Sequence, residues 1–271
     1  IESCQDAFFI ITGLAIQLVG AVFVPAEENI PPEKIRELKD YSDTEFIITK
    51  DNITLDKNMS YDRIRNLLRN VNSPKKEFEL PSRNEIAEIL FTTGTTGKQK
   101  GIIMTHGANI ALAQNISHGV DMKKGNIEII TVPLNHSYGL RSVYASLYNG
   151  SSMVIIDNKF LIKELFMSLD KYRATSICLV PAVLNIIFRI AKDNLSKYKN
   201  SLDYVQSGSA ALLEEQKDRL VELLPHTRLY NFYGSTESGR SSILEYSKDK
   251  NKYGSIGKPT INAKFAIFDD D

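Results

Sequence analysis

Short apolar runs alternate with longer amphipathic stretches along almost the whole chain. The short runs are rich in β-branched residues, which is typical of strands buried on both faces. They occupy residues 21–24, 45–49, 88–91, 101–104, 128–132, 152–156, 176–180, 203–206, 228–232, 242–245 and 264–268. The pattern therefore predicts many short strands separated by helices.

Helical periodicity fills several of the intervals. Pro31 begins a predicted helix over residues 31–41, because proline fits the first helical turn. Two further helices are predicted where leucines recur on one face: Leu161, Leu165 and Leu169, and then Leu213, Leu220, Leu223 and Leu224. Strands that alternate with helices predict the fold class α/β, with layered, mixed, largely parallel sheets flanked by helices. The stretch 51–82 is more polar and predicts an excursion on the surface.

One apolar stretch, residues 7–26, contains no charged residue and reaches the minimum length of a membrane span. Thr12, Gln17, Gly20 and Pro25 interrupt it, and no basic flank follows. We interpret it as a buried helix, a stop near Gly20 and a short buried strand over residues 21–24. The sequence thus predicts no membrane span.

Composition and charge narrow the classes of protein. The 271 residues contain 33 Lys and Arg against 33 Asp and Glu, so the formal net charge is zero. Hydrophobic residues make up 42%, which fits a globular protein and not a disordered one. A nucleic-acid partner usually requires a basic excess, and none is expected here. The two cysteines, Cys4 and Cys178, suit a reduced, cytoplasmic protein and cannot build a disulfide framework.

The most informative segment lies between two predicted strands and is rich in Thr and Gly. It reads Thr92-Thr93-Gly94-Thr95-Thr96-Gly97-Lys98-Gln99-Lys100-Gly101. Glycine allows backbone N–H groups to converge on an anion, and Thr and Lys add donors and positive charge. The glycine spacing differs from that of the P-loop of nucleoside triphosphatases. Composition alone leaves two readings open, a phosphate cradle and a flexible polar hairpin.

A second segment, residues 231–237, ends a predicted strand with two aromatics and then turns at a glycine. It reads Asn231-Phe232-Tyr233-Gly234-Ser235-Thr236-Glu237. An aromatic face can stack on a purine, and a carboxylate beside phosphates can hold Mg²⁺. Taken alone, the segment is equally well explained as an ordinary exposed turn.

Together, the segments resemble the signature motifs of the adenylate-forming superfamily, which includes acyl- and aryl-CoA synthetases. The first matches the family's Gly-x-Pro-Lys-Gly loop with Gln99 in place of proline, and the second matches its Tyr-Gly-x-Thr-Glu motif. Three more matches keep the family's order: Gly20–Pro25, Gly208-Ser209-Ala210-Ala211-Leu212, and Gly254-Ser255-Ile256-Gly257-Lys258-Pro259. The resemblance implies that residues 1–271 are part of the N-terminal AMP-binding domain. It places a ribose-binding Asp and the C-terminal domain with its Lys beyond this stretch, so we expect a fragment that is inactive by itself.

The resemblance also implies roles for individual residues. Lys100 and the loop residues Thr92, Thr93, Gly94, Thr95, Thr96 and Gly97 would hold the β- and γ-phosphates of ATP. Thr236 would bind the α-phosphate, and Glu237 would bind Mg²⁺. The adenine would be held by Tyr233 and its neighbours Asn231, Phe232, Gly234 and Ser235, together with the backbone of Ser209, Ala210 and Ala211.

His136 lies in the sequence Pro133-Leu134-Asn135-His136-Ser137-Tyr138-Gly139, which resembles a motif of acyl- and aryl-CoA synthetases. In those enzymes the His lines the acyl pocket, so we expect His136 to do so, whereas His106, His118 and His226 are expected to be structural. Amino-acid-activating domains usually carry a Phe-Asp pair here, and this chain has none. The resemblance therefore implies activation of a fatty or aryl acid to acyl-AMP, followed by transfer to CoA or to the phosphopantetheine of a carrier protein.

Four alternatives were weighed against this function. A serine hydrolase and a Rossmann dehydrogenase are disfavoured, because the chain lacks both the Gly-x-Ser-x-Gly and the Gly-x-Gly-x-x-Gly patterns. A nucleotide-binding or scaffold homologue without catalysis stays open, since Gln99 departs from the family's loop. An amino-acid-activating adenylation domain also stays open.

Overall fold

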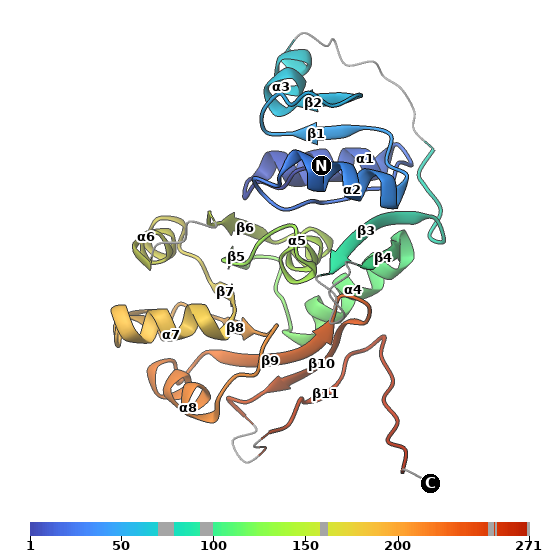
Figure 1. Ribbon diagram of the computed structural model, residues 1–271. Helices are drawn as coiled ribbons and strands as arrows, with labels where there is room; N and C mark the ends of the chain where they lie inside the picture. The colour runs from blue at the N-terminus through green and yellow to red at the C-terminus, as the bar shows by residue number, and fades with distance from the viewer. Residues whose placement is uncertain (70–78, 93–99, 158–161, 249–251, 253, 270–271) are drawn as a thin grey trace. The chain divides into compact units, whose positions relative to one another are not determined.

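The computed structural model describes residues 1–69, 79–92, 100–157, 162–248, 252 and 254–269. The chain forms two compact units, Ile1–Ala108 and Asn109–Asp271. Each unit is described by itself below, with the element labels of Figure 1.

The first unit combines three helices with two small sheets. Its elements are α1 (Ala7–Leu18), α2 (Pro32–Ser42), β1 (Ile47–Thr49), β2 (Asn58–Ser60), α3 (Tyr61–Arg69), β3 (Ile86–Thr92) and β4 (Lys100–Thr105). Strands β1 and β2 pair in parallel, and β3 and β4 form an antiparallel hairpin. The predicted helix 31–41 is confirmed as α2.

The uncharged stretch 7–26 folds as a short helix and a bridge. Asp6 caps α1 by accepting a hydrogen bond from the N–H of Phe9 at 3.0 Å, and the chain turns at Gly20, whose φ is +79°. Phe23 then makes an isolated bridge to Glu88, so the predicted strand over residues 21–24 is reduced to one residue pair. Among the described residues, no helix has both the length and the apolar character that crossing a membrane requires.

The polar stretch 51–82 has more regular structure than its composition indicates. It contains β2 and α3, and β2 pairs with β1. The sequence prediction of a surface excursion misses both elements. Tyr61 explains their anchoring, because its side chain is buried and its hydroxyl donates a hydrogen bond to the carbonyl of Glu2.

The second unit is built on one seven-stranded sheet with the order β11-β10-β9-β8-β7-β5-β6. Strands β6, β5, β7, β8 and β9 are parallel neighbours, and β10 and β11 continue the sheet antiparallel. This mixed, largely parallel sheet confirms the predicted fold class. Its strands are β5 (Ile127–Ile130), β6 (Ser152–Ile155), β7 (Ser176–Leu179), β8 (Tyr204–Ser207), β9 (Arg228–Ser235), β10 (Gly239–Glu245) and β11 (Lys258–Pro259).

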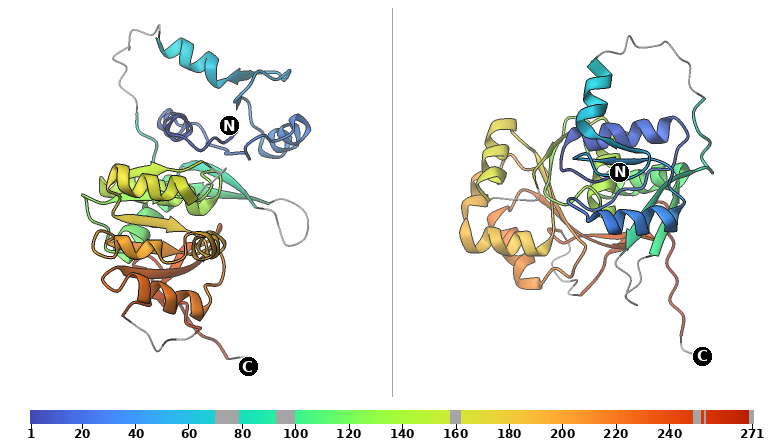
Figure 2. Two further views of the ribbon diagram at one scale, coloured as in Figure 1. Left: turned by 90° about the vertical axis from the view of Figure 1, so that its left-hand side faces the viewer. Right: turned by 45° about the horizontal axis from the view of Figure 1, so that its top comes forward.

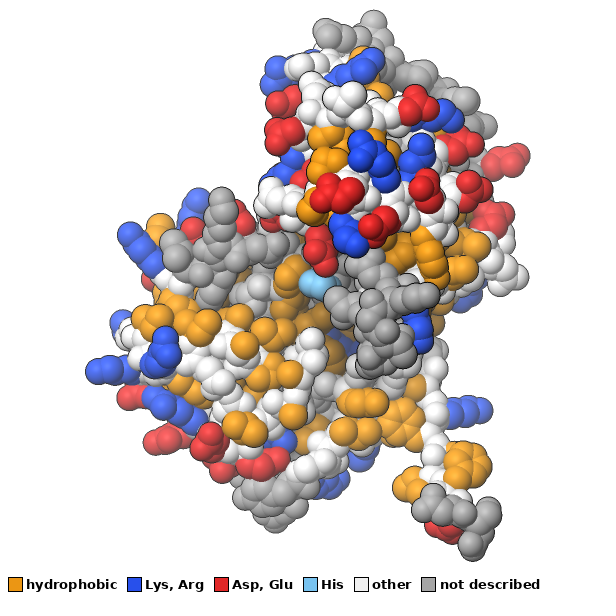
Figure 3. All heavy atoms as spheres, viewed as in Figure 1, with side chains coloured by type: hydrophobic (Ala, Val, Ile, Leu, Met, Phe, Trp, Pro, Cys, Tyr) orange, Lys and Arg blue, Asp and Glu red, His pale blue; other side chains and the backbone are white. Residues whose placement is uncertain are grey.

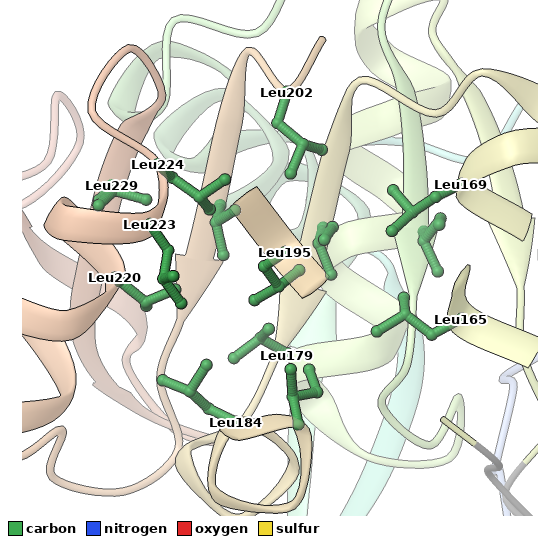
Figure 4. Packing of buried hydrophobic residues seen from close by; sticks show 14 of the residues in the cluster. Leu165, Leu169, Leu179, Leu184, Leu195, Leu202, Leu220, Leu223, Leu224 and Leu229 are labelled. Carbon is green, nitrogen blue, oxygen red and sulfur yellow. The ribbon is translucent and has the colours of Figure 1, made fainter. Parts of the chain in front are cut away.

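Helices cover both faces of this sheet. On one face lie α6 (Ile162–Tyr172), α7 (Pro181–Ile190) and α8 (Glu214–Leu223), which are turned towards the viewer in the left-hand view of Figure 2. Their aliphatic side chains meet those of the strands in the main core, shown in Figure 4. On the other face lie α4 (His106–Gly119), which begins in the first unit, and α5 (Ser137–Asn149). A short 3₁₀ helix, Asn194–Tyr198, follows α7.

Five of the seven leucines used to predict helices lie where expected. Leu165, Leu169, Leu220, Leu223 and Leu224 are all buried in the main core. Leu213 lies just outside α8 and is 54% exposed, so it does not share that face. Leu161 falls outside the described residues.

The predicted strand over residues 264–268 is wrong. These residues have no strand partner in the described part of the chain, and the last strand is instead β11, where Lys258 pairs with Ile243. Ile267 and Phe268 are 96% and 86% exposed, so their apolar pattern is not buried here. A β-like pattern forms a strand only where a neighbour accepts its backbone hydrogen bonds.

Both cysteines are buried and neither forms a disulfide, and one lies in each unit. Burial raises the pKa of each thiol to about 12, with the carboxylate of Asp6 adding to the effect at Cys4. Neither residue lines the cavity described below.

Candidate functional site

A cavity of about 310 Å³ opens in the second unit, where four neighbouring parallel strands end. Segments after β5, β7 and β8 and the tip of the β9–β10 hairpin contribute its walls. Ligands in open α/β sheets bind at this edge, because the loops there diverge and leave a crevice. Its lining residues are Ile116, Val132, Pro133, His136, Ser137, Tyr138, Arg141, Val180, Ser209, Phe232, Gly234, Ser235, Thr236, Gly239 and Arg240.

The hairpin tip presents Thr236 to the cavity. Ser235 pairs with Gly239 across β9 and β10, so only three residues make the turn, and Gly239 adopts a left-handed φ of +61° that closes it. At Gly234 a side chain is excluded, since a Cβ there would lie 1.8 Å from the carbonyl oxygen of Gly239. The tight turn therefore requires glycine at these positions, and it holds Ser235 and Thr236 at the mouth of the cavity.

His136 stands at the start of α5, where the chain turns after β5. Its N–H donates to the carbonyl of Pro133 at 3.3 Å, and its side chain is exposed. Gly139 permits this tight turn, because a Cβ there would lie 2.2 Å from the Pro133 oxygen. The motif around His136 is thus a compact helix start that points its His into the cavity's lining.

Two aromatic rings and a guanidinium form one wall. The rings of Tyr138 and Phe232 meet edge to face with centroids 4.6 Å apart, and the guanidinium of Arg240 lies 3.8 Å from the centroid of Phe232. The Tyr138 hydroxyl lies 3.1 Å from the carbonyl oxygens of both Leu179 and Gln206. Burial raises the pKa of Tyr138 well above its usual range, so it stays protonated and neutral.

A series of hydrogen-bonded, buried polar side chains extends from this wall into the interior. Arg240 Nη1 donates to Gln206 Oε1 at 2.6 Å, and Gln206 Nε2 donates to the carboxylate of Glu128. All three side chains are buried. Burial raises the pKa of Glu128 to about 7 and lowers the pKa of Arg240, because both charged forms lose water. Arginine nevertheless stays charged, since its ordinary pKa lies so far above neutrality.

The structure brings together six of the predicted site residues around the cavity, namely His136, Ser209, Phe232, Gly234, Ser235 and Thr236. Five others in this unit, Asn231, Tyr233, Ala210, Ala211 and Glu237, do not line it. Tyr233 is 55% exposed, which leaves its ring accessible for stacking. Its role in binding adenine remains a prediction, as do the roles of the other four.

Glu237 occupies the exposed hairpin tip beside Thr236. Within the described ranges, no three or more His, Cys, Asp or Glu side chains gather where they could hold a metal ion. A single carboxylate is still compatible with Mg²⁺, because that ion commonly takes one or two carboxylates and completes its shell with phosphates and water. Magnesium at Glu237 stays a prediction.

The predicted phosphate loop, residues 92–101, belongs to the first unit. Thr92 ends β3 and pairs directly with Lys100, which begins β4, so a hairpin brings the two ends of the loop together. Residues Thr93, Gly94, Thr95, Thr96 and Gly97, which we expect to bind phosphate, lie outside the described residues. The β3–β4 pairing is compatible with both readings of this segment, and the choice between them stays a prediction.

Four functional candidates were missed from the sequence: Tyr138, Arg141, Gln206 and Arg240. Arg141 and Arg240 are 2% and 4% exposed and line the cavity. The only sequence signal is position: Arg141 follows the His136 motif, and Arg240 follows the Thr-Glu motif after Ser238 and Gly239. An arginine next to a recognised motif should therefore be counted as a site candidate together with the motif.

The outer surface of the first unit carries charges of both signs. In the upper part of Figure 3, acidic and basic side chains alternate on the face shown. This distribution agrees with the zero formal net charge. The visible face therefore has no extended region of purely positive or purely negative charge.

Comparisons with known proteins place the chain in a family. The profile of the family described as AMP-binding enzyme matches residues 6–271. The probable CoA ligase CCL5 of Humulus lupulus is 29% identical over 97% of this chain, which covers 52% of that protein. The 4-coumarate--CoA ligase-like 8 of Arabidopsis thaliana is 33% identical over 69% of this chain, which covers 34% of that protein. The chain thus spans about half, or less, of the length of these relatives.

Solved structures show the same fold. The crystal structure of VinN superposes with a TM-score of 0.84 at 21% identity, covering 96% of this chain and 67% of that one. The o-succinylbenzoate CoA synthetase of Bacillus subtilis, in complex with its acyl-adenylate intermediate, superposes with a TM-score of 0.84 at 19% identity. That match covers 98% of this chain and 55% of the other. With the family profile extending over nearly every residue, the chain belongs to the AMP-binding enzymes, the adenylate-forming superfamily.

Proposed function

We propose that this protein uses ATP to activate a carboxylic acid as acyl-AMP and then transfers the acyl group to the thiol of CoA. One observation carries the proposal. Three motifs that are far apart in the sequence, around His136, Ser209 and Thr236, line a single cavity at the carboxyl ends of parallel strands. Unrelated surface turns would have no reason to converge there.

In the first half-reaction, a carboxylate oxygen attacks the α-phosphorus of ATP. The bond from that phosphorus to the bridging oxygen breaks, and pyrophosphate leaves. Two anions must meet, so the protein's contribution is positioning and neutralisation of charge. In this proposal Thr236 donates to the α-phosphate, Lys100 and the loop 92–97 bind the β- and γ-phosphates, and Glu237 binds Mg²⁺.

The acid occupies the apolar part of the cavity. Ile116, Val132, Val180 and Phe232 line it, and such walls accept the hydrocarbon body of an acid. Relatives named as 4-coumarate-CoA ligases make aryl acids the first class to test, with fatty acids second. The same names favour CoA over a carrier protein's phosphopantetheine as acceptor. The cytoplasmic location expected from the cysteines belongs to the proposal too, and cell fractionation tests it.

ATP–pyrophosphate exchange on the protein at its full natural length tests the proposal. Aryl, fatty and amino acids should be compared, and we expect exchange with an aryl or fatty acid. Lys100→Ala should slow exchange about 10²- to 10³-fold, the usual effect of losing one donor to a developing charge. Lys248→Ala is the control, because Lys248 is an exposed lysine of the second unit paired only with Glu245 in the described structure.

Glu237→Gln should raise the Mg²⁺ concentration needed for half-maximal exchange. Unchanged exchange in both site variants would contradict the assigned roles. Retained AMP binding with no exchange for any acid would instead support a non-catalytic homologue. Exchange with amino acids alone would support an amino-acid-activating domain.

A further inference from the structure

Arg240 is a buried charged group of the cavity with unpaired hydrogen-bond donors. Its side chain is 4% exposed and contributes to the cavity wall. Nη1 donates to Gln206, whereas Nε and Nη2 have no hydrogen-bond partner among the described residues. A buried guanidinium normally has its donors paired, because unpaired buried donors lose water without compensation. Two unpaired donor atoms beside a cavity point to a ligand that supplies hydrogen-bond acceptors.

The local fold directs Arg240 into this position. Gly234 and Arg240 are paired across the hairpin, and the register shifts between Arg240 and Ser242. A bulge of this kind re-aims side chains, and bulges are frequent beside binding sites. The Phe232 ring under the guanidinium fixes its plane at a centroid distance of 3.8 Å. The group is therefore pre-organised before a ligand arrives.

The surrounding charges leave room for another anion. Hydrogen bonds link Glu128 to Arg240 through the amide of Gln206, and the Glu128 carboxylate does not line the cavity. Arg141 adds a second buried guanidinium to the cavity's lining. Burial raises the pKa of Glu128 to about 7, so its carboxylate is only partly ionised at neutral pH. Among the described residues that line the cavity, two are arginines and none is acidic.

Building on the function proposed above, we propose that Arg240 binds a second carboxylate at the far end of the acid, so that the substrate is a dicarboxylic acid. The first carboxylate is the one activated near Thr236. The apolar walls, including Val180 and Phe232, accommodate the hydrocarbon between the two carboxylates. A nucleotide phosphate is the other anion that Arg240 could bind, but a phosphate gains nothing from apolar walls.

The test compares acids that differ only in the second carboxylate. Terephthalic acid is matched with 4-methylbenzoic acid, and adipic acid with hexanoic acid, at the protein's full natural length. Binding of each acid is measured by calorimetry without ATP, and kcat/KM by pyrophosphate exchange. We expect the wild type to prefer one diacid over its partner and Arg240→Gln to weaken that diacid about 10- to 100-fold, the range for hydrogen bonds to a charged group.

Two further variants make the result specific. Arg240→Lys keeps the charge without the planar fork, and it should retain part of the preference. Arg228→Gln is the matched control, because Arg228 lies on the same hairpin with Nη2 bonded to Asp203 at 2.7 Å and Nη1 to the carbonyl of Val120 at 2.7 Å. It should lower stability without changing the ratio between diacid and monoacid. Thermal melting establishes that each variant is folded.

The outcomes separate this inference from the proposed function. Exchange with monoacids and no preference for diacids overturns the inference while the function stands. Arg240-dependent diacid binding without exchange supports the inference and contradicts the function. Equal losses for both acids in Arg240→Gln, or a loss confined to AMP affinity, overturns the inference in favour of a structural or nucleotide-binding role.

Discussion

The two faces of the seven-stranded sheet are chemically different, although alternate residues of the same strands form both. The face towards α6, α7 and α8 is aliphatic, with strand side chains such as Leu179 and Leu229 in the main core (Figure 4). The face towards α4 and α5 is polar, and its buried strand residues include Glu128, Ser176, Cys178, Tyr204 and Gln206.

This difference separates the residues that stabilise the fold from those that lead to the ligand cavity. Aliphatic packing gains free energy from burial and from close contact, at roughly 1.5–3 kcal/mol for each large side chain. Polar groups in the interior must first offset their lost hydration, so their net contribution is smaller. The polar face leads through Gln206 and Arg240 to the cavity. We conclude that one face stabilises the fold and the other is committed to the site.

The largest expected effect lies on the aliphatic face. Leu184 of α7 is fully buried in the main core, so Leu184→Ala should lower the free energy of unfolding by about 2–5 kcal/mol through lost contacts and a residual cavity. Ile190→Ala on the same helix is the control, because Ile190 is 61% exposed. Denaturant unfolding measures both, and similar losses would show that the core is not concentrated on this face.

The next effect lies on the polar face and depends on pH. The folded-state pKa of Glu128 is about 7, against an ordinary value of 4.5, so the folded protein holds this proton more tightly than the unfolded chain. Its stabilising contribution is complete below pH 4.5 and is lost as the pH rises through about 7. Glu128→Gln mimics the protonated form and does not titrate. Its free energy of unfolding, relative to that of the wild type, should therefore rise by about 3 kcal/mol as the pH increases from about 5 to about 8.

Unfolding of both proteins across that pH range measures the difference. The amide can still accept the hydrogen bond that Gln206 donates, so the geometry should be kept. A difference that does not vary with pH would show that the burial of Glu128 does not shift its titration. In that case, burying polar groups on this face would cost less free energy than the comparison of the two faces implies.

The smallest effect is expected at the edge of the polar face. The Tyr138 hydroxyl bonds the carbonyls of Leu179 and Gln206, whereas its ring packs on Phe232. Tyr138→Phe keeps the ring and loses the hydroxyl, so stability should fall by about 1 kcal/mol. Thermal unfolding checks this value, and a loss like that of Leu184→Ala would place a major source of stability on the polar face.

The sequence predicted the parallel strands of the second unit to within a few residues. Runs such as 128–132 and 176–180 are apolar or β-branched enough to identify a buried strand by themselves. Prediction failed at residues 264–268, where a strand pattern lacks a partner, and in the polar stretch that holds β2 and α3. Pairing depends on distant residues, which a local pattern does not contain.

The site shows the same limit. Short motifs identified His136, Ser209 and Thr236, because each combines glycine with polar residues in a fixed order. No local pattern identifies Arg240 or Gln206, since their importance comes from burial against Phe232 and Glu128. Charged residues that fold into the interior can be recognised only once the neighbours that bury them are known.

The buried thiols have a practical consequence for experiments. With pKa values of about 12, Cys4 and Cys178 are almost entirely protonated at pH 7, and the thiolate is the form that alkylating reagents attack. The folded chain should therefore resist maleimide labelling at its own cysteines. Ser238→Cys, on the exposed hairpin tip, would then offer a single reactive position for a fluorophore beside the cavity mouth. Such a probe would report ligand entry directly, without requiring turnover.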